Sequence, residues 1–240
     1  MKTSADKRQL ARELQAKVNS LQGFGPLRGP SVPGLSPFDS AFPGGVFPLG
    51  TLHEFVSYQP AHAASTCGFI SALAGKILKR DGLCLWIGDK TVFPAGLSHF
   101  GIEPERIVFV HAIKKREALA VAEEALKCDA LTAVVADIPE LGFTDSRRLQ
   151  LAAEKSGVTG FIHRYSPASE NSVACASRWK VTPLPSEVMD DLPGIGTIRW
   201  DIQLNKVKNG RPASWQIGWD GRFVDLAPQT IIRTLERFVG

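Results

Sequence analysis

The chain has 240 residues, of which 44% are hydrophobic and 22% are charged, so it can bury a sizeable core without metals or disulfides. Its formal net charge of +4 is compatible with a nucleic-acid partner but does not require one. No segment reaches the roughly 18 apolar residues of a membrane helix, and no apolar run follows the charged residues 1–8, which predicts a cytoplasmic protein with no signal peptide and no membrane contact.

The N-terminal part of the chain predicts a helix followed by a long connection. Apolar residues recur at helical spacing between charged residues over residues 6–21, which predicts an amphipathic helix. These apolar positions are Leu10, Leu14, Val18 and Leu21. Residues 23–48 are rich in glycine and proline and predict loop and turn. A single apolar stripe packs either on its own domain or on another chain, so self-association through this helix is one hypothesis.

Residues 49–165 alternate between strand and helix patterns. Apolar runs predict strands over residues 49–56, 83–88, 107–110, 131–137 and 160–164. Helical periodicity predicts helices over residues 66–79, 115–128 and 145–156. Near-continuous apolar strands that alternate with helices are typical of a mainly parallel sheet with helices on both faces.

The pattern changes after Ser166. Strands are expected over residues 174–181, 198–207 and 215–219, and Asn209-Gly210 predicts a turn, so antiparallel strands should extend the sheet at its C-terminal end. A last helix over residues 229–239 carries an apolar stripe that includes Ile231, Leu235 and Phe238. The predicted organisation is an N-terminal helix and linker (1–33), an α/β core (34–226) and a C-terminal amphipathic helix (227–240).

An α/β nucleotide-binding domain would hold its phosphates just after the strand at 49–56. Such a site needs glycines, backbone N–H groups at a helix N-terminus, a lysine for the phosphates and a hydroxyl for Mg²⁺. Residues 57–66 contain no glycine and no lysine, and Pro60 removes one N–H donor. The residues where the motif would end are Ala63, Ala64, Ser65 and Thr66. Both hydroxyl residues are expected to cap the helix, so we expect a degenerate loop, no ATP or Mg²⁺ cofactor and no hydrolysis, with weak nucleotide binding left open.

Two further features bear on ligand chemistry. Asp137 closes the strand at 131–137, where nucleotide-binding domains hold an acid that orients Mg²⁺ or water, but a lone aspartate often caps the next turn. The cysteines are scattered, with no CxxC pair and no histidine at ligand spacing, which predicts small buried thiols and no metal site.

Over residues 34–219 the order and spacing of these features resemble the RecA family. Residues 34–50 resemble the lead-in to the family's phosphate loop, Val134-Val135-Ala136-Asp137 its acidic strand, and residues 171–181 the strand after its second DNA-binding loop. Residues 206–209 resemble the strand that follows. The resemblance implies a RecA-like α/β fold. The chain departs from the family where Ala63-Ala64-Ser65-Thr66 replaces the GKT sequence, and only Asp89 lies near the place of the catalytic glutamate, so recombinase activity is not expected.

The chain more specifically resembles the family of inducible mutagenesis protein A, whose members are RecA-related bacterial proteins. Several short segments carry it, and the most specific is Ser146-Arg147-Arg148-Leu149-Gln150-Leu151-Ala152-Ala153-Glu154. The resemblance implies an accessory role in translesion DNA synthesis during the SOS response to DNA damage. It implies a catalytically dead Y-family polymerase homologue and an error-prone polymerase α subunit as partners, with RecA and DNA as further candidates. The SulA family of cell-division inhibitors also resembles RecA, but its members are shorter.

Basic and apolar side chains outside the predicted core are candidates for contacts with DNA or a partner. Arg148 begins a helix, where its long stem can also pack. Lys206, Lys208 and Arg211 surround the predicted turn and could bind phosphate, although any exposed hairpin tip also needs charge. Ile231, Leu235 and Phe238 could dock in a partner's groove or pack on their own domain. The tryptophans of the predicted strands are expected to pack in the core rather than stack on bases, and these are Trp179, Trp200, Trp215 and Trp219.

The leading prediction is a non-catalytic, RecA-like accessory factor in damage-induced mutagenesis. One alternative is an ATP-dependent DNA-binding protein with an aberrant phosphate loop, which a test of nucleotide binding distinguishes. The other is a SulA-like inhibitor of cell division, which binding to a cell-division polymer distinguishes.

Overall fold

The structure is a computed structural model that describes residue 32 and residues 34–78, 82–88, 92–112, 114–186 and 196–226. The helices expected over 6–21 and 229–239 lie outside these residues, and so do Asp89 and the C-terminal apolar stripe of Ile231, Leu235 and Phe238.

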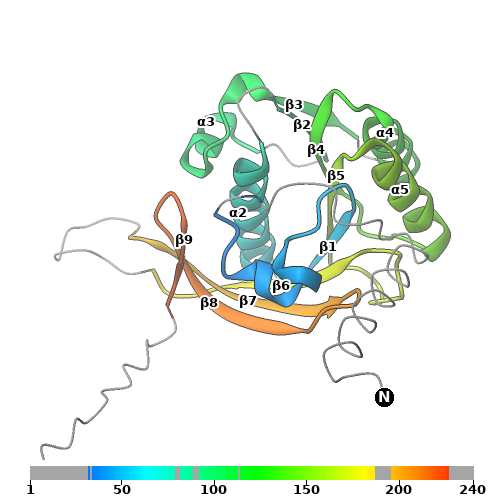
Figure 1. The fold of residues 1–240 in the computed structure, drawn as a ribbon. Coiled ribbons are helices and arrows are strands. Elements are labelled where there is room, and N and C mark those ends of the chain that lie inside the picture. The colour runs from blue at the N-terminus through cyan, green and yellow to red at the C-terminus, as the bar shows by residue number, and fades with distance from the viewer. Residues whose placement is uncertain are drawn as a thin grey trace, which may run out of the picture.

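Within the described residues, nine strands form one sheet in the order β3-β2-β4-β5-β1-β6-β7-β8-β9 (Figure 1). Strands β1 to β6 pair in parallel, and β6 to β9 pair antiparallel. The strands are β1 (Leu52–Ser57), β2 (Leu83–Gly88), β3 (Ile107–His111), β4 (Leu131–Asp137), β5 (Thr159–Tyr165), β6 (Ser177–Pro183), β7 (Ile198–Val207), β8 (Ala213–Trp219) and β9 (Phe223–Asp225). This arrangement confirms the predicted mainly parallel sheet with antiparallel strands at its C-terminal end.

Helices cover both faces of the sheet, as predicted (Figure 1). Helix α2 (Pro60–Ile77) packs on one face, and α4 (Lys115–Lys127) and α5 (Phe143–Ser156) pack together on the other. A short helix α3 (Pro94–Leu97) and four 3-10 turns complete the secondary structure of the described residues. These turns are η1 (Phe38–Ala41), η2 (Pro43–Gly45), η3 (Ser98–Phe100) and η4 (Pro104–Arg106).

Each face of the sheet has its own hydrophobic core. The core under α2 is rich in aromatic side chains, and it holds Trp179, Trp200 and Trp219 almost completely buried, with Trp215 packed against them. The expectation that these tryptophans pack in the core is therefore confirmed. The core under α4 and α5 is built mainly from aliphatic residues and alanines, which lets the two helices lie close to the sheet.

The glycine- and proline-rich residues 34–50 are more ordered than the loop we expected. They form η1 and η2, and Leu35, Phe38, Phe42 and Phe47 are buried in the aromatic core. The Phe38 ring makes edge-to-face contacts with four other aromatic rings, at centroid distances between 5.0 and 5.9 Å. Such contacts stabilise this segment against the sheet through burial and aromatic geometry.

The prediction that a loop runs from Ser57 to Thr66 is wrong. Helix α2 begins at Pro60, six residues before the expected start at Thr66. Proline is well tolerated in the first turn of a helix, because its missing N–H would have no helical partner there. The alanines that follow have the highest helix propensity of any residue, so they extend the helix toward β1.

A buried hydrogen-bonded series fixes His53 of β1. Its Nδ1 lies 2.6 Å from the Ser177 hydroxyl and its Nε2 lies 2.9 Å from the Pro48 carbonyl. The Pro48 carbonyl can only accept, so the neutral ring donates to it from Nε2 and Nδ1 is an acceptor. Ser177 therefore donates to Nδ1, and the Ser177 oxygen accepts from the Trp179 indole. Burial lowers the pKa of His53 from 6.5 to about 4, although the bond to Pro48 opposes this shift.

We expect the free energy of unfolding to fall as the pH decreases from 6.5 toward 4, because unfolded His53 takes up a proton that the folded ring excludes. The folded pKa lies below the unfolded one, so this contribution is fully present above pH 6.5 and is lost as the pH falls, by about 3 kcal/mol in total. Urea unfolding at several pH values measures the slope of the free energy of unfolding against pH. This slope should become shallower in His53→Gln and stay unchanged in His99→Gln, which alters an exposed ring. Equal slopes in all three proteins would contradict the assignment.

Candidate functional site

The connection between β1 and α2 is very short. Strand β1 ends at Ser57 and α2 begins at Pro60, so just Tyr58 and Gln59 lie between them. A phosphate-binding loop spans about eight residues there and aims consecutive backbone N–H groups at the ligand. A two-residue connection has no room for that arc, and Pro60 contributes no N–H to the start of the helix.

The four residues expected at the end of a degenerate loop lie inside α2. Ala63 and Thr66 are buried, whereas Ala64 and Ser65 line a surface groove. The expectation that Ser65 and Thr66 cap the helix is wrong, because the N-cap residue is Gln59 and no side chain caps the helix there. The Thr66 hydroxyl is buried and has no hydrogen-bond partner among the described residues.

Asp137 joins a hydrogen-bonded series across the carboxyl ends of three neighbouring strands. Its Oδ1 lies 2.9 Å from Nδ1 of His163 on β5, and Nε2 of that ring lies 2.7 Å from the Ser57 hydroxyl at the end of β1. A Cβ atom on Gly88 would lie 2.6 Å from the other Asp137 oxygen, so β2 closes over the carboxylate. Although the order resembles a hydrolytic triad, Ser57 is only 2% exposed, so we assign the series a structural role.

A buried ion network lies in the middle of the sheet. Glu54 of β1 and Arg164 of β5 are both fully buried and pair at 2.8 Å. Arg178 of β6 pairs with the other Glu54 oxygen at 2.6 Å. Buried charges of this kind are tolerated only when paired and hydrogen-bonded, and here one carboxylate serves two guanidinium groups.

The same two arginines hold the connections that follow β4 and β5. Arg164 donates to the carbonyl groups of Pro139 and Ser169, at 3.0 Å each, and Arg178 donates to that of Asn171 at 2.6 Å. The sequence resemblance places a DNA-binding loop of the RecA family in this region. In this chain the segment is instead fixed to the sheet by charge-assisted hydrogen bonds.

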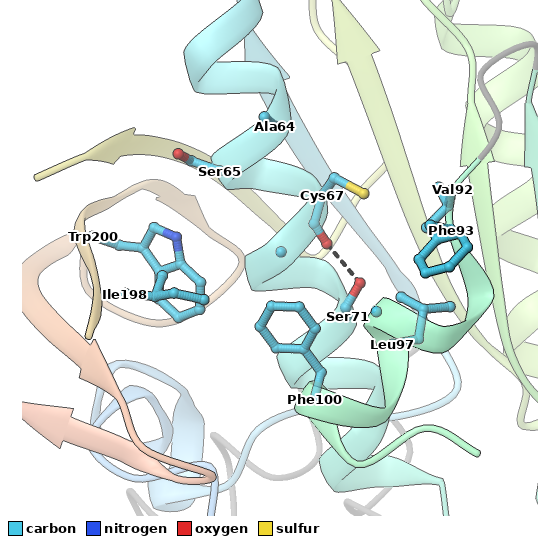
Figure 2. A pocket seen from close by; sticks show the side chains of 12 residues that line it. Ala64, Ser65, Cys67, Ser71, Val92, Phe93, Leu97, Phe100, Ile198 and Trp200 are labelled. Carbon is cyan, nitrogen blue, oxygen red and sulfur yellow. Dashed lines mark hydrogen bonds between the residues drawn. The ribbon is translucent and has the colours of Figure 1, made fainter. Parts of the chain in front are cut away.

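An apolar groove of about 400 Å³ runs along the outer side of α2 (Figure 2). Figure 2 shows Trp200 and Ile198 on one side of the helix, Phe100 at the lower end, and Val92, Phe93 and Leu97 on the other side. The floor is α2 itself, where the Ser71 hydroxyl donates to the Cys67 carbonyl and so satisfies its polar group within the helix. Phe93 is 74% exposed, so a large apolar ring stands open to solvent at the rim.

The basic residues proposed for contacts occupy three different settings. Arg148 forms an ion pair with Glu123, which joins α5 to α4. Lys206 donates to the Val173 carbonyl at 3.1 Å. Burial lowers the pKa of Lys208, and the nearby cations Arg147 and Lys206 lower it further, although Glu154 opposes them. Lys208 therefore lies within electrostatic range of Arg147 on α5 and Lys206 on β7.

The hairpin turn between β7 and β8 is confirmed, with Asn209 in the left-handed region at φ 58°. It is not a freely projecting tip, because a Cβ on Gly210 would lie 2.3 Å from the Ala41 carbonyl. The amide of Arg211 donates to that same carbonyl at 3.0 Å, and its side chain is exposed. Of the three basic residues expected around the turn, Lys206 and Lys208 are partly buried and Arg211 is exposed.

Among the described residues, no group of three or more His, Cys, Asp or Glu side chains is arranged to hold a metal ion. Within the same residues, no helix is both long and apolar enough to cross a bilayer. The thiols of Cys84 and Cys175 are buried as expected, but Cys128 is exposed.

Sequence reasoning missed the groove, the His163 series and the Glu54 network. The available signal for the network was a charged residue inside each of three predicted strands, namely Glu54, Arg164 and Arg178. A charge that a strand buries must be paired, so Glu54 and the two arginines could have been matched as opposite charges. For the groove no such signal exists, because its residues come from three separate regions of the chain.

Comparisons with known proteins bear on the family and the fold. No protein-family model matches the chain. The chain is 33% identical over 190 residues to Protein ImuA of Caulobacter vibrioides, in each of two strains, and the match covers 74% of this chain and 78% of the relative.

Two solved structures are also similar. A KaiC-like protein from Pyrococcus horikoshii aligns with a TM-score of 0.53 and 13% identity, over 83% of this chain and 99% of that one, which supports the RecA-like fold alone. SulA from Pseudomonas aeruginosa aligns with a TM-score of 0.40 and 19% identity, over 48% of this chain and 97% of that one.

Proposed function

The chain belongs to the ImuA family, and from this premise we propose that it is a non-catalytic accessory factor in damage-induced mutagenesis, which acts through contacts with other proteins during translesion DNA synthesis. The proposed partners are a catalytically dead Y-family polymerase homologue and an error-prone polymerase α subunit, with RecA and DNA as secondary partners. We place this activity in the cytoplasm.

One observation carries the non-catalytic part of the proposal, namely the two-residue connection between Ser57 and Pro60. Phosphoryl transfer depends on positioning the phosphates and their metal ion with preorganised donors and cations. Here the two-residue connection is too short to form an arc of backbone N–H groups around a phosphate. Asp137, the candidate acid for Mg²⁺ or water, instead accepts a hydrogen bond from His163. These features support a RecA-like domain that does not use nucleotide.

We assign the polymerase contact to the groove along α2. A large apolar patch on an otherwise polar protein surface often marks a site of interaction with another molecule. The groove joins an exposed helix face at Ala64 to the open Phe93 ring. Its small lining residues, Gly68 on α2 and Gly96 on α3, let a partner side chain approach closely. An apolar side chain from a partner helix fits such a depression.

The frequency of damage-induced mutation tests the function directly. The gene for this chain is deleted from the chromosome of its own bacterium, and the wild-type chain or a variant is supplied from a plasmid. We expect the wild-type chain to restore mutation after ultraviolet damage. Ala64→Arg and Phe93→Asp should reduce the frequency to that of the deletion strain, because each places a charge in the groove. A pull-down of the polymerase homologue with the same variants locates the loss.

Leu151→Arg is the matched control, since Leu151 is 48% exposed on α5, away from the groove. It should restore mutation and bind the homologue like the wild type. Full activity of both groove variants would contradict the assigned surface. A wild-type chain that binds a cell-division polymer in place of the polymerase homologue would contradict the function.

A further inference from the structure

Strand β3 is the edge of the sheet among the described residues. In the described part of the chain it pairs with β2, and no strand lies on its other side (Figure 1). Edge strands are usually protected by charges, prolines or bulges, because their free N–H and C=O groups invite another strand. The sequence Ile107-Val108-Phe109-Val110 has none of these devices.

Apolar side chains are exposed on both faces of this edge. Val108 is 49% exposed and Phe109 is 38% exposed, and Leu83 on the neighbouring strand is 37% exposed. The Phe109 ring lies beside Trp86, with 6.5 Å between the ring centroids. An apolar patch on the outer edge strand of a sheet is suited to an added strand.

We propose that β3 pairs antiparallel with β3 of a second copy of this chain, so that two sheets join into one across a two-fold axis. A symmetric pairing centred on Phe109 places the two Phe109 rings opposite each other, which is a favourable cross-strand aromatic pair. It also places Val108 opposite Val110 and Ile107 opposite His111. Every apolar side chain of the edge then gains an apolar or aromatic neighbour.

The charges that flank β3 favour a second copy over other strands, and antiparallel over parallel pairing. Glu103 and Glu105 are exposed just before the strand, and Lys114 and Lys115 are exposed just after it. Antiparallel pairing brings the acidic start of one copy to the basic end of the other, twice per dimer. Parallel pairing would bring like charges together. Within its own chain Lys114 lies 3.5 Å from Glu117, an exposed pair of little energetic weight.

Light scattering coupled to size-exclusion chromatography measures the mass of the full-length chain. We expect a species with twice the 26.0 kDa mass of the chain at micromolar concentration. Phe109→Lys should give a monomer, with a dissociation constant raised at least about tenfold, because the substitution places an unpaired ammonium at the two-fold axis. Phe143→Lys is the matched control, since that ring is 59% exposed on α5, and it should remain dimeric.

A charge exchange separates this interface from any other. The double variant Glu103→Lys with Glu105→Lys should be monomeric, and so should Lys114→Glu with Lys115→Glu. Mixed in equal amounts, the two variants should form a heterodimer, because each then meets the opposite charge at both ends. A monomeric wild type would overturn the proposal, even if another protein bound at Phe109. A dimer that none of these variants weakens would overturn it equally.

Discussion

Replacing Arg164 by methionine is expected to lower the free energy of unfolding by about 3 to 5 kcal/mol. The guanidinium is fully buried and donates to Glu54 and to the carbonyl groups of Pro139 and Ser169. Its loss leaves the fully buried Glu54 carboxylate with Arg178 as its remaining cation, and it removes the donor to the two carbonyl groups. Urea unfolding of the wild type and the variant measures the difference.

Arg148→Met is the matched control for this experiment. Its ion pair with Glu123 joins two helices at the surface, and the arginine side chain is 60% exposed. Exposed pairs contribute about 1 kcal/mol or less, so this variant should remain close to wild type. Adding Glu54→Gln to Arg164→Met should cost less than the sum of the single changes, since both remove one interaction. Similar losses for Arg148→Met and Arg164→Met would contradict the buried network.

The second large effect is expected at Gly75 on α2. A Cβ atom there would lie 1.9 Å from the Phe100 carbonyl oxygen and 3.1 Å from its carbon. Because the obstacle is backbone, the helix and η3 must move apart, and Gly75→Ala should lower the free energy of unfolding by about 2 kcal/mol or more despite the helix propensity of alanine.

Gly68 offers a control on the same helix. A Cβ there would lie 3.4 Å from the Phe100 ring and 3.5 Å from the Trp200 ring, which is ordinary contact. Gly68→Ala should therefore leave stability unchanged or raise it by up to about 1 kcal/mol. Denaturant unfolding of both variants checks the contrast, and equal effects at the two glycines would contradict the close approach of η3 to α2.

The sequence predicted most strands because their apolar runs are continuous. Strands β2, β4 and β7 begin and end where the pattern places them. Strand β9 was missed because three residues carry too little pattern. The buried packing of Phe38 was missed because a glycine- and proline-rich segment suggests a surface loop, whereas tertiary contacts with distant rings decide its place.

The candidate site was harder to predict than the fold. Pro60 suggested a loop, although proline also occurs in the first turn of helices. Because Pro60 was assigned to a loop, the predicted β1–α2 connection was too long. Glu54 and Arg164 are 110 residues apart in the sequence, so local pattern says nothing of their pairing. Periodicity identifies which face of an element is apolar, but it does not identify which distant residue meets it.

Nucleotide binding tests the central claim most directly. Purified wild-type chain is titrated with a fluorescent ATP analogue and Mg²⁺, with and without single-stranded DNA, and Asp137→Ala is titrated in parallel. A RecA-like accessory factor that works without nucleotide predicts no binding up to millimolar concentrations in either protein. Micromolar binding by the wild type that is lost in Asp137→Ala would contradict this account and would make the protein a nucleotide-controlled switch.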